Sequence, residues 1–121
     1  VPMGMIDTGI AKSRATASDA RADLAEAKSR LMFAEAWLKV TASGHRAANA
    51  LADSKVGQQG AIAPVMDAVL TQTDAINTRA IADVDDLRLR RQSAQGRLTV
   101  AEKSQTAMTR LAEETDKIIG D

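Results

Sequence analysis

Residues 57–60 read Gly-Gln-Gln-Gly, and this stretch decides the fold because it separates two long segments that favour helix. Glycine loses more backbone freedom in a helix than any other residue. Two glycines this close together are therefore expected to interrupt a helix. Pro64 follows, and proline suits the first turn of a helix, where its missing N–H costs nothing. The sequence therefore predicts a turn at 57–60 and a new helix over 64–119.

Before the break, the chain carries the seven-residue repeat of packed helices. Small or apolar side chains recur at alternating steps of three and four residues. These positions are Ile10, Ser13, Ala17, Ala20, Leu24, Ala27, Leu31, Ala34, Leu38 and Thr41. We expect a helix over 8–43 that stops at Ser43-Gly44 and a short second helix over 45–56. Residues 1–7 are expected to form an irregular lead-in, with Asp7 or Thr8 capping the first helix.

After the break, a similar repeat continues almost to the end of the chain. It runs through Ile62, Met66, Val69, Thr73, Ile76, Ala80, Val84, Leu87, Arg91, Ala94, Leu98, Ala101, Gln105, Met108, Ala112, Thr115 and Ile119. Gly96 leaves three alternatives open: a continuous helix, a kink, or a third arm. We therefore predict an all-α fold without β-sheet, as one helical domain over 8–121. Its form is an antiparallel long-helix hairpin or a three-helix bundle with coiled-coil packing.

The composition argues against a thick globular core. The chain has 121 residues and is 45% hydrophobic, but about a fifth of it is alanine, with one Phe, one Trp and no Tyr. Alanine favours helix and buries little area, whereas aromatic side chains bury the most. Long helices that approach closely through alanine fit this composition, and self-association or binding to partner helices, most simply as a homo-oligomer, would supply the missing buried area.

Charge and cysteine content exclude several classes of function. Sixteen basic residues balance 16 acidic ones, so bulk electrostatics does not favour nucleic acid. Without cysteine there is no disulfide, thiol nucleophile or Cys-based metal site. No apolar run approaches the roughly 20 residues of a transmembrane helix, and no signal peptide is visible. The chain begins at Val1 without an initiator Met, as in a processed form or an excised segment.

The sequence contains little that could carry catalysis. His45 is the only histidine, and beside Gly44 it is interpreted as an exposed turn residue, with a metal ligand or a proton switch as the alternative. Met3 and Met5 are the other metal candidates, since thioethers bind soft ions such as Cu(I). No set of reactive groups converges, so we predict that the protein is not an enzyme and has no cofactor.

The sequence carries two charged clusters, of which the acidic one is interpreted as a solvated helix face. Asp83, Asp85 and Asp86 form the acidic cluster, and Arg88, Arg90, Arg91 and Arg97 the basic one. No aromatic residue lies near the arginines to stack on bases. For the arginines, pairing between helices or at i,i+3, for instance of Asp85 with Arg88, is the preferred interpretation.

Phe33 and Trp37 are four residues apart and share a helix face. We interpret them as anchors of the helix packing, with a partner-binding hot spot as the alternative. Met32, Met66 and Met108 lie at or beside repeat positions, which predicts core packing for them.

The stretch Ala34-Glu35-Ala36-Trp37-Leu38 resembles a pattern of the TolC-type outer-membrane factors, particularly their heavy-metal efflux branch. The corresponding features downstream are the break at 57–60, the residues Val65-Met66-Asp67-Ala68-Val69-Leu70 and the residues Ala94-Gln95-Gly96-Arg97-Leu98. The resemblance covers roughly residues 20–100. Family members are several times longer and add the β-strands of an outer-membrane barrel, which this chain lacks.

The resemblance implies an excised helical segment or a distant relative, and not a working channel. It favours the bacterial cell envelope or periplasm over the cytoplasm or a virion. The leading hypothesis is a structural or interaction module, as a component of an envelope transport or secretion assembly or, alternatively, a virion or filament subunit. A helical ligand- or metal-sensing domain is the other hypothesis.

Overall fold

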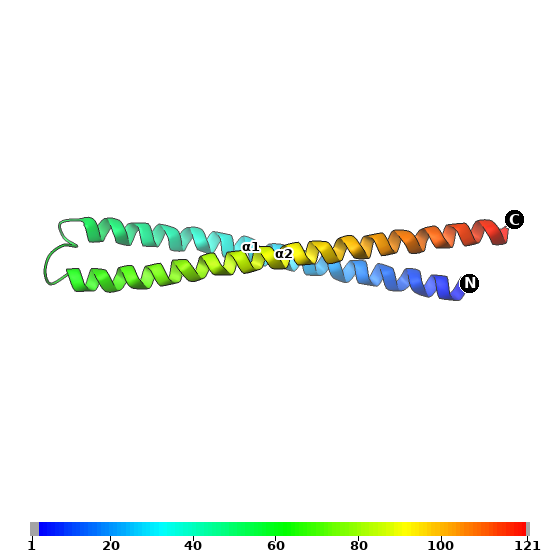
Figure 1. The fold of residues 1–121 in the computed structure, drawn as a ribbon, viewed down its shortest axis with the longest axis horizontal. Helices are drawn as coiled ribbons and strands as arrows, with labels where there is room; N and C mark the ends of the chain where they lie inside the picture. Colours follow the sequence, from blue (N-terminus) through cyan, green and yellow to red (C-terminus); the bar gives the residue numbers. More distant parts are fainter. Residues whose placement is uncertain (1–2, 121) are drawn as a thin grey trace. The chain divides into compact units, whose positions relative to one another are not determined.

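The computed structural model describes residues 3–120, and it consists of two helices that pack against each other (Figure 1). Helix α1 spans Met3–Asp53 and helix α2 spans Ala63–Gly120. Residues 3–120 contain no strand. The predicted all-α fold is confirmed, and of its two forms the protein adopts the helical hairpin and not the three-helix bundle.

The start of α1 corrects the predicted lead-in over 1–7. The helix begins at Met3, whereas Val1 and Pro2 lie outside the described residues. Ile6 is 1% exposed, and burying an isoleucine is worth roughly 1.5–3 kcal/mol, which outweighs the helix cost of Gly4. Thr8 does not cap the helix. Its hydroxyl donates to the Gly4 carbonyl at 2.8 Å, as an interior threonine does.

The predicted stop at Ser43-Gly44 is also wrong, because α1 continues unbroken to Asp53. No glycine among residues 3–120 has a positive φ, so Gly44 does not adopt the left-handed conformation of a helix end. Thr41 and Ala48, on either side of it, are buried. Their packing offsets the roughly 1 kcal/mol that glycine costs inside a helix. Helix α2 likewise runs through Gly96 without a break.

The connection between the helices is a series of overlapping turns. Ser54 organises its first half: its hydroxyl donates to the Leu51 carbonyl at 2.5 Å and accepts from the Gly57 N–H at 3.2 Å. The Gln59 carbonyl organises the second half, because it accepts from the N–H groups of Ile62 and Ala63 at 2.9 and 2.8 Å. The predicted turn at 57–60 is confirmed.

Gly57 is required in this turn for steric reasons. A Cβ at this position would overlap the Leu51 carbonyl oxygen and lie 2.8 Å from backbone atoms of Ala52. Gly60, by contrast, has nothing within 4 Å of such a Cβ. The close approach at Gly57 explains why the chain turns back immediately after α1.

Tertiary contacts divide the chain into two units, which are described separately: residues 1–28 with 90–121, and residues 29–89. The core of the first unit is built mainly from alanine. It consists of Ala17, Ala20, Leu24, Ala94, Leu98 and Ala101, with Ala27 packed against it. Gly9 faces Met108 so closely that a Cβ at Gly9 would overlap the Met108 methyl group. Small residues thus let the helices approach closely in this unit.

The second unit mixes apolar and polar residues between its helices. Leu31, Ala48, Met66, Ala80 and Val84 are buried there. A polar group lies among them. The Thr41 hydroxyl is 3.0 Å from the Leu38 carbonyl and 3.1 Å from Asn77 Oδ1. The second unit therefore places a polar contact among its buried apolar side chains.

The predicted repeat describes α1 better than α2. Every predicted α1 position from Ile10 to Thr41 is buried or half-buried. In α2, three predicted positions are exposed: Ile76, Arg91 and Ile119. Asn77 is half-buried in place of Ile76, because it stands seven residues from both Leu70 and Val84 in the repeat.

Candidate functional site

His45 is part of the helix packing and not an exposed turn residue as predicted. Its Nδ1 lies 2.9 Å from Thr73 Oγ1, and its Nε2 lies 3.8 Å from Asp74 Oδ1. The Thr73 hydroxyl donates to the Leu70 carbonyl at 3.2 Å, so its oxygen can accept a hydrogen bond from the Nδ1–H of His45. These contacts give the only histidine of the sequence a structural role in the second unit.

Of the three metal candidates, Met5 lies in the first unit and His45 in the second. Met5 is 67% exposed on the first turns of α1, and the side chain of Met3 lies outside the described residues. Within residues 3–120, no group of three or more His, Asp or Glu side chains could hold a metal ion.

The charged clusters lie on solvated helix surface, as predicted for Asp83, Asp85 and Asp86. Asp85 Oδ1 lies 3.9 Å from Arg88 Nη1, which confirms the expected i,i+3 pair. Arg97 Nη1 donates to the Ser93 hydroxyl at 3.5 Å. Exposed pairs of this kind contribute little to stability, about 0–1 kcal/mol.

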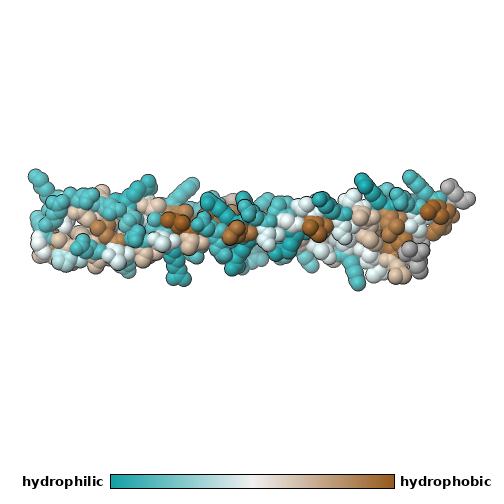
Figure 2. All heavy atoms as spheres, viewed as in Figure 1, coloured by the Kyte–Doolittle hydropathy of each residue, from teal (hydrophilic) through white to brown (hydrophobic). Residues whose placement is uncertain are grey.

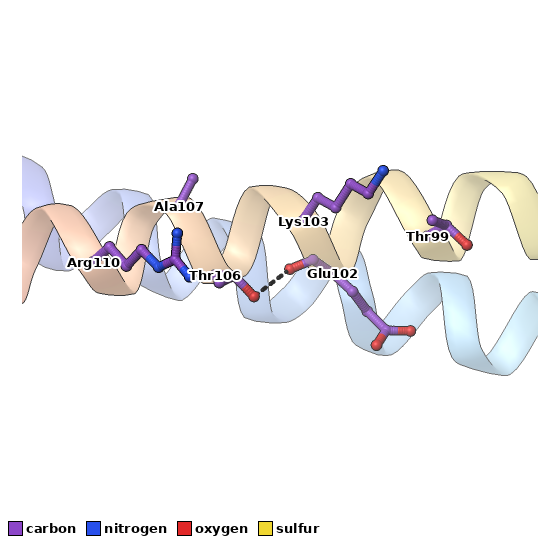
Figure 3. Close-up of a pocket in the computed structure, with 6 residues that line it drawn as sticks. All are labelled: Thr99, Glu102, Lys103, Thr106, Ala107 and Arg110. Atoms are coloured by element: carbon purple, nitrogen blue, oxygen red, sulfur yellow. Dashed lines mark hydrogen bonds between the residues drawn. The ribbon is translucent and has the colours of Figure 1, made fainter.

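Three shallow depressions on the described surface are lined by residues of a single helix or by long polar side chains. One of about 410 Å³ is formed by Thr99, Glu102, Lys103, Thr106, Ala107 and Arg110, all from α2 (Figure 3). In Figure 3 the Lys103 and Glu102 side chains point away from each other, and the Thr106 hydroxyl donates to the Glu102 carbonyl of its own helix at 3.0 Å. Such an arrangement does not bring reactive groups together around a substrate.

The surface of the protein carries large apolar side chains in separate places. On the face drawn in Figure 2, brown apolar patches lie within a largely polar surface. Phe33 is 77% exposed and Trp37 is 49% exposed. The interpretation of these two residues as anchors of the helix packing is wrong, and Met32, at 73% exposure, is not a core residue either. Met66 is buried, as predicted.

Phe33 and Trp37 belong to a longer exposed surface on α1. On a helix whose contacts repeat every seven residues, positions seven apart form a row, and three rows lie side by side here. We call this surface the uncharged face: Phe33, Val40 and Ala47; Trp37, Gly44 and Leu51; Ala36, Ser43 and Ala50. All of these residues are exposed, and they all lie in the second unit.

No charged residue interrupts the uncharged face between residues 33 and 51. The charges of this segment, Glu35, Lys39 and Arg46, stand in other rows of the helix. Val40 is 59% exposed and Leu51 is 51% exposed, so large apolar groups occur at both ends of the face and near its centre. Gly44 is open, with nothing within 4 Å of a Cβ at this position.

The sequence pattern singles out Phe33 and Trp37, but the rest of the uncharged face was not predicted from it. The sequence does contain a pattern for it, because the residues 33, 37, 40, 44, 47 and 51 follow one another at alternating steps of four and three. It was hidden by the stronger repeat one row away, which contains Leu31, Leu38 and Thr41. A helix with two adjacent repeats has two faces to cover.

Neither described helix holds a segment that is both long and apolar enough to cross a membrane.

Comparison with known proteins adds no assignment: no family model matches the chain, and no match was found among curated proteins or solved structures.

Proposed function

We propose that the protein is a non-enzymatic helical interaction module that binds a partner helix through the uncharged face of α1. The observation that carries the proposal is the exposure of Phe33 and Trp37, at 77% and 49%, on a surface without charge. Tryptophan and other aromatic side chains dominate the binding energy of interfaces once they are buried in a partner.

The shape of the uncharged face supports a helical partner. Its rows follow α1 for about 27 Å, at 1.5 Å per residue. Another helix can lie along such a face and fill it with side chains at the same spacing. Contiguous exposed apolar surface of this kind typically marks an interaction site in a water-exposed protein. The uncharged face thus has the length and the chemistry of half of a helix-helix interface.

The resemblance to TolC-type factors supports an envelope transport or secretion assembly as the setting, because Trp37 belongs both to the resembling stretch and to the uncharged face. A virion or filament subunit is the alternative setting, and it would use the same face for lateral packing. Both settings call for a surface that is exposed in one chain and covered in the assembly.

Photo-crosslinking in the source cell tests the proposal. A photoreactive amino acid at Val40, on the uncharged face, should yield discrete protein adducts. The same amino acid at Met32 is the matched control, because Met32 is even more exposed on α1, at 73% against 59% for Val40, but lies in another row. Adducts from Val40 that are no stronger than those from Met32 would contradict the proposal.

A further inference from the structure

We propose that the partner of the uncharged face is a second copy of this chain. The two α1 helices lie antiparallel, and the twofold axis that relates them passes between Val40 and Gly44, level with residue 42. This inference rests on the function proposed above and names its partner. It follows from the spacing and the sizes of the residues on the face.

The spacing of the uncharged face is the same in both directions. Taken together, the row of Phe33 and the row of Trp37 have successive residues that are 4, 3, 4, 3 and 4 positions apart, from Phe33 to Leu51. A twofold axis level with residue 42 therefore places every position of these two rows opposite another position of the same two rows. A surface that is complementary to itself under a twofold rotation is what an isologous dimer requires.

The sizes of the side chains are also complementary under this rotation. Bulky residues occupy the N-terminal half of the rows, and small ones occupy most of the C-terminal half. The rotation places Trp37 opposite Ala47, and Val40 opposite Gly44. Large side chains opposite small ones give the close interdigitation of well-packed interfaces.

Phe33 meets Leu51 at each end of the paired rows in this arrangement. Phe33 is 77% exposed and Leu51 is 51% exposed, so both have area to lose. The outer row adds Ser43, which lies beside its own copy at the axis, with Ala36 beside Ala50. No charge has to be buried, because none lies on the face.

A parallel pair would pack poorly. It would place Phe33 against Phe33 and Trp37 against Trp37, and it would leave the two Gly44 positions facing each other across a gap. Cavities of this kind and crowded bulky pairs both weaken packing. The distribution of residue sizes therefore favours the antiparallel arrangement.

The area is sufficient for a weak to moderate dimer. An aromatic side chain that becomes fully buried removes about 150–250 Å² from water. Four aromatic side chains and the aliphatic groups around them bring the two copies to the order of 1,000 Å², near the lower end of specific interfaces. We therefore expect an equilibrium between monomer and dimer that depends on protein concentration.

Sedimentation equilibrium of the full chain measures this equilibrium. The 12.8 kDa chain should reach twice its mass as its concentration rises. Trp37→Ala should raise the dimer dissociation constant by about 30-fold or more. Met32→Ala removes a large side chain that is more exposed than Trp37 but lies in another row, and it should leave the constant unchanged. Equal effects of the two substitutions would contradict the proposal.

Gly44→Leu separates the interface from helix stability. Nothing lies near Gly44 in the single chain, and leucine is the better helix former, so helicity should be kept or increased. In the dimer the new side chain meets Val40 of the second copy, so the dissociation constant should rise by about 10-fold or more. A Gly44→Leu variant that dimerises as well as the natural chain would overturn the predicted packing.

Crosslinking gives the orientation, and the cysteine-free sequence provides a clean background. A mixture of Ala36→Cys and Ala50→Cys chains with a short bis-maleimide should give the mixed dimer. Leu51→Cys chains alone should not crosslink, because their residues 51 lie about 27 Å apart along the axis in the antiparallel pair. Crosslinking of Leu51→Cys without the mixed product would overturn the antiparallel arrangement.

The two proposals fail in different ways. A chain that stays monomeric in sedimentation, but whose position 40 photo-crosslinks to a different protein, overturns the dimer and keeps the interaction module. A monomeric chain with no specific adduct from position 40 removes both.

Discussion

Asn77 Oδ1 lies 3.1 Å from the Thr41 hydroxyl, at a position of the α2 repeat where an apolar residue would be expected. A polar residue at one such position fixes the register between helices at a cost in stability. The pair connects residues 36 apart in the sequence and so defines which turn of α1 meets which turn of α2 in the second unit.

Asn77→Leu should therefore stabilise the chain by about 1 kcal/mol, because an apolar side chain replaces a half-buried amide. Thr41 keeps its bond to the Leu38 carbonyl, so no buried hydroxyl is left without a partner. Urea unfolding followed by circular dichroism measures the change. Asn49→Leu, on the exposed surface of α1, is the control and should shift stability by less than about 0.5 kcal/mol. A loss of stability in Asn77→Leu would refute the register interpretation.

Ala17→Leu should destabilise the chain by about 1–3 kcal/mol. Ala17 is 0% exposed in the alanine core of the first unit, where no space remains for three further carbon atoms. The matched control is Ala22→Leu, the same change at an exposed position of the same helix. Thermal unfolding of the two variants should separate clearly, and similar midpoints would show that the alanine core is loosely packed.

Gly57→Ala should cost more than about 1 kcal/mol, since the new methyl group meets the backbone of Leu51 and Ala52. Gly60→Ala is its control within the same turn. Gly60 has open space around it and no positive φ, so alanine there should be neutral or stabilising by about 0.4–1 kcal/mol. Differential scanning calorimetry would detect both changes, and the idea fails if the two variants melt together.

Gly96→Ala should stabilise the chain by about 0.5–1 kcal/mol, because Gly96 lies inside α2 with nothing within 4 Å of a Cβ. Gly9→Ala improves helix propensity equally but pushes against the Met108 side chain, which has to move. Its gain should be smaller in the same urea titration. Equal gains would mean that Met108 yields without cost.

The repeat of α1 was predictable because its seven-residue period is consistent from Ile10 to Thr41, and only small or apolar residues and two hydroxyls occupy it. In α2 the prediction followed hydrophobicity at Ile76, whereas the structure follows the period and faces Asn77 inward. Arg91 stands at a repeat position but remains exposed, since a long side chain keeps its charge in water.

The breaks were harder to predict than the repeats. Gly44 and Gly57 are the same residue type, yet Gly44 lies within α1 and Gly57 lies in the turn that follows it. The difference arises from buried neighbours on both sides of Gly44, which single-residue propensity does not contain. The exposure of Phe33 and Trp37 was missed for a related reason: hydrophobicity says that a side chain prefers burial, but not whether its own chain provides it.

The turn at 57–60 also determines the order in which contacts between the two helices form during folding. The contact of His45 with Thr73 in the second unit joins residues that are 28 positions apart in the sequence. Gly9 and Met108, which lie close together in the first unit, stand near opposite ends of the sequence. The entropy of closing a loop rises with its length, so the contacts nearest the turn form at the lowest cost. Folding should start beside the turn and proceed towards the termini, and the amide protons of the first unit should exchange first when the helices separate.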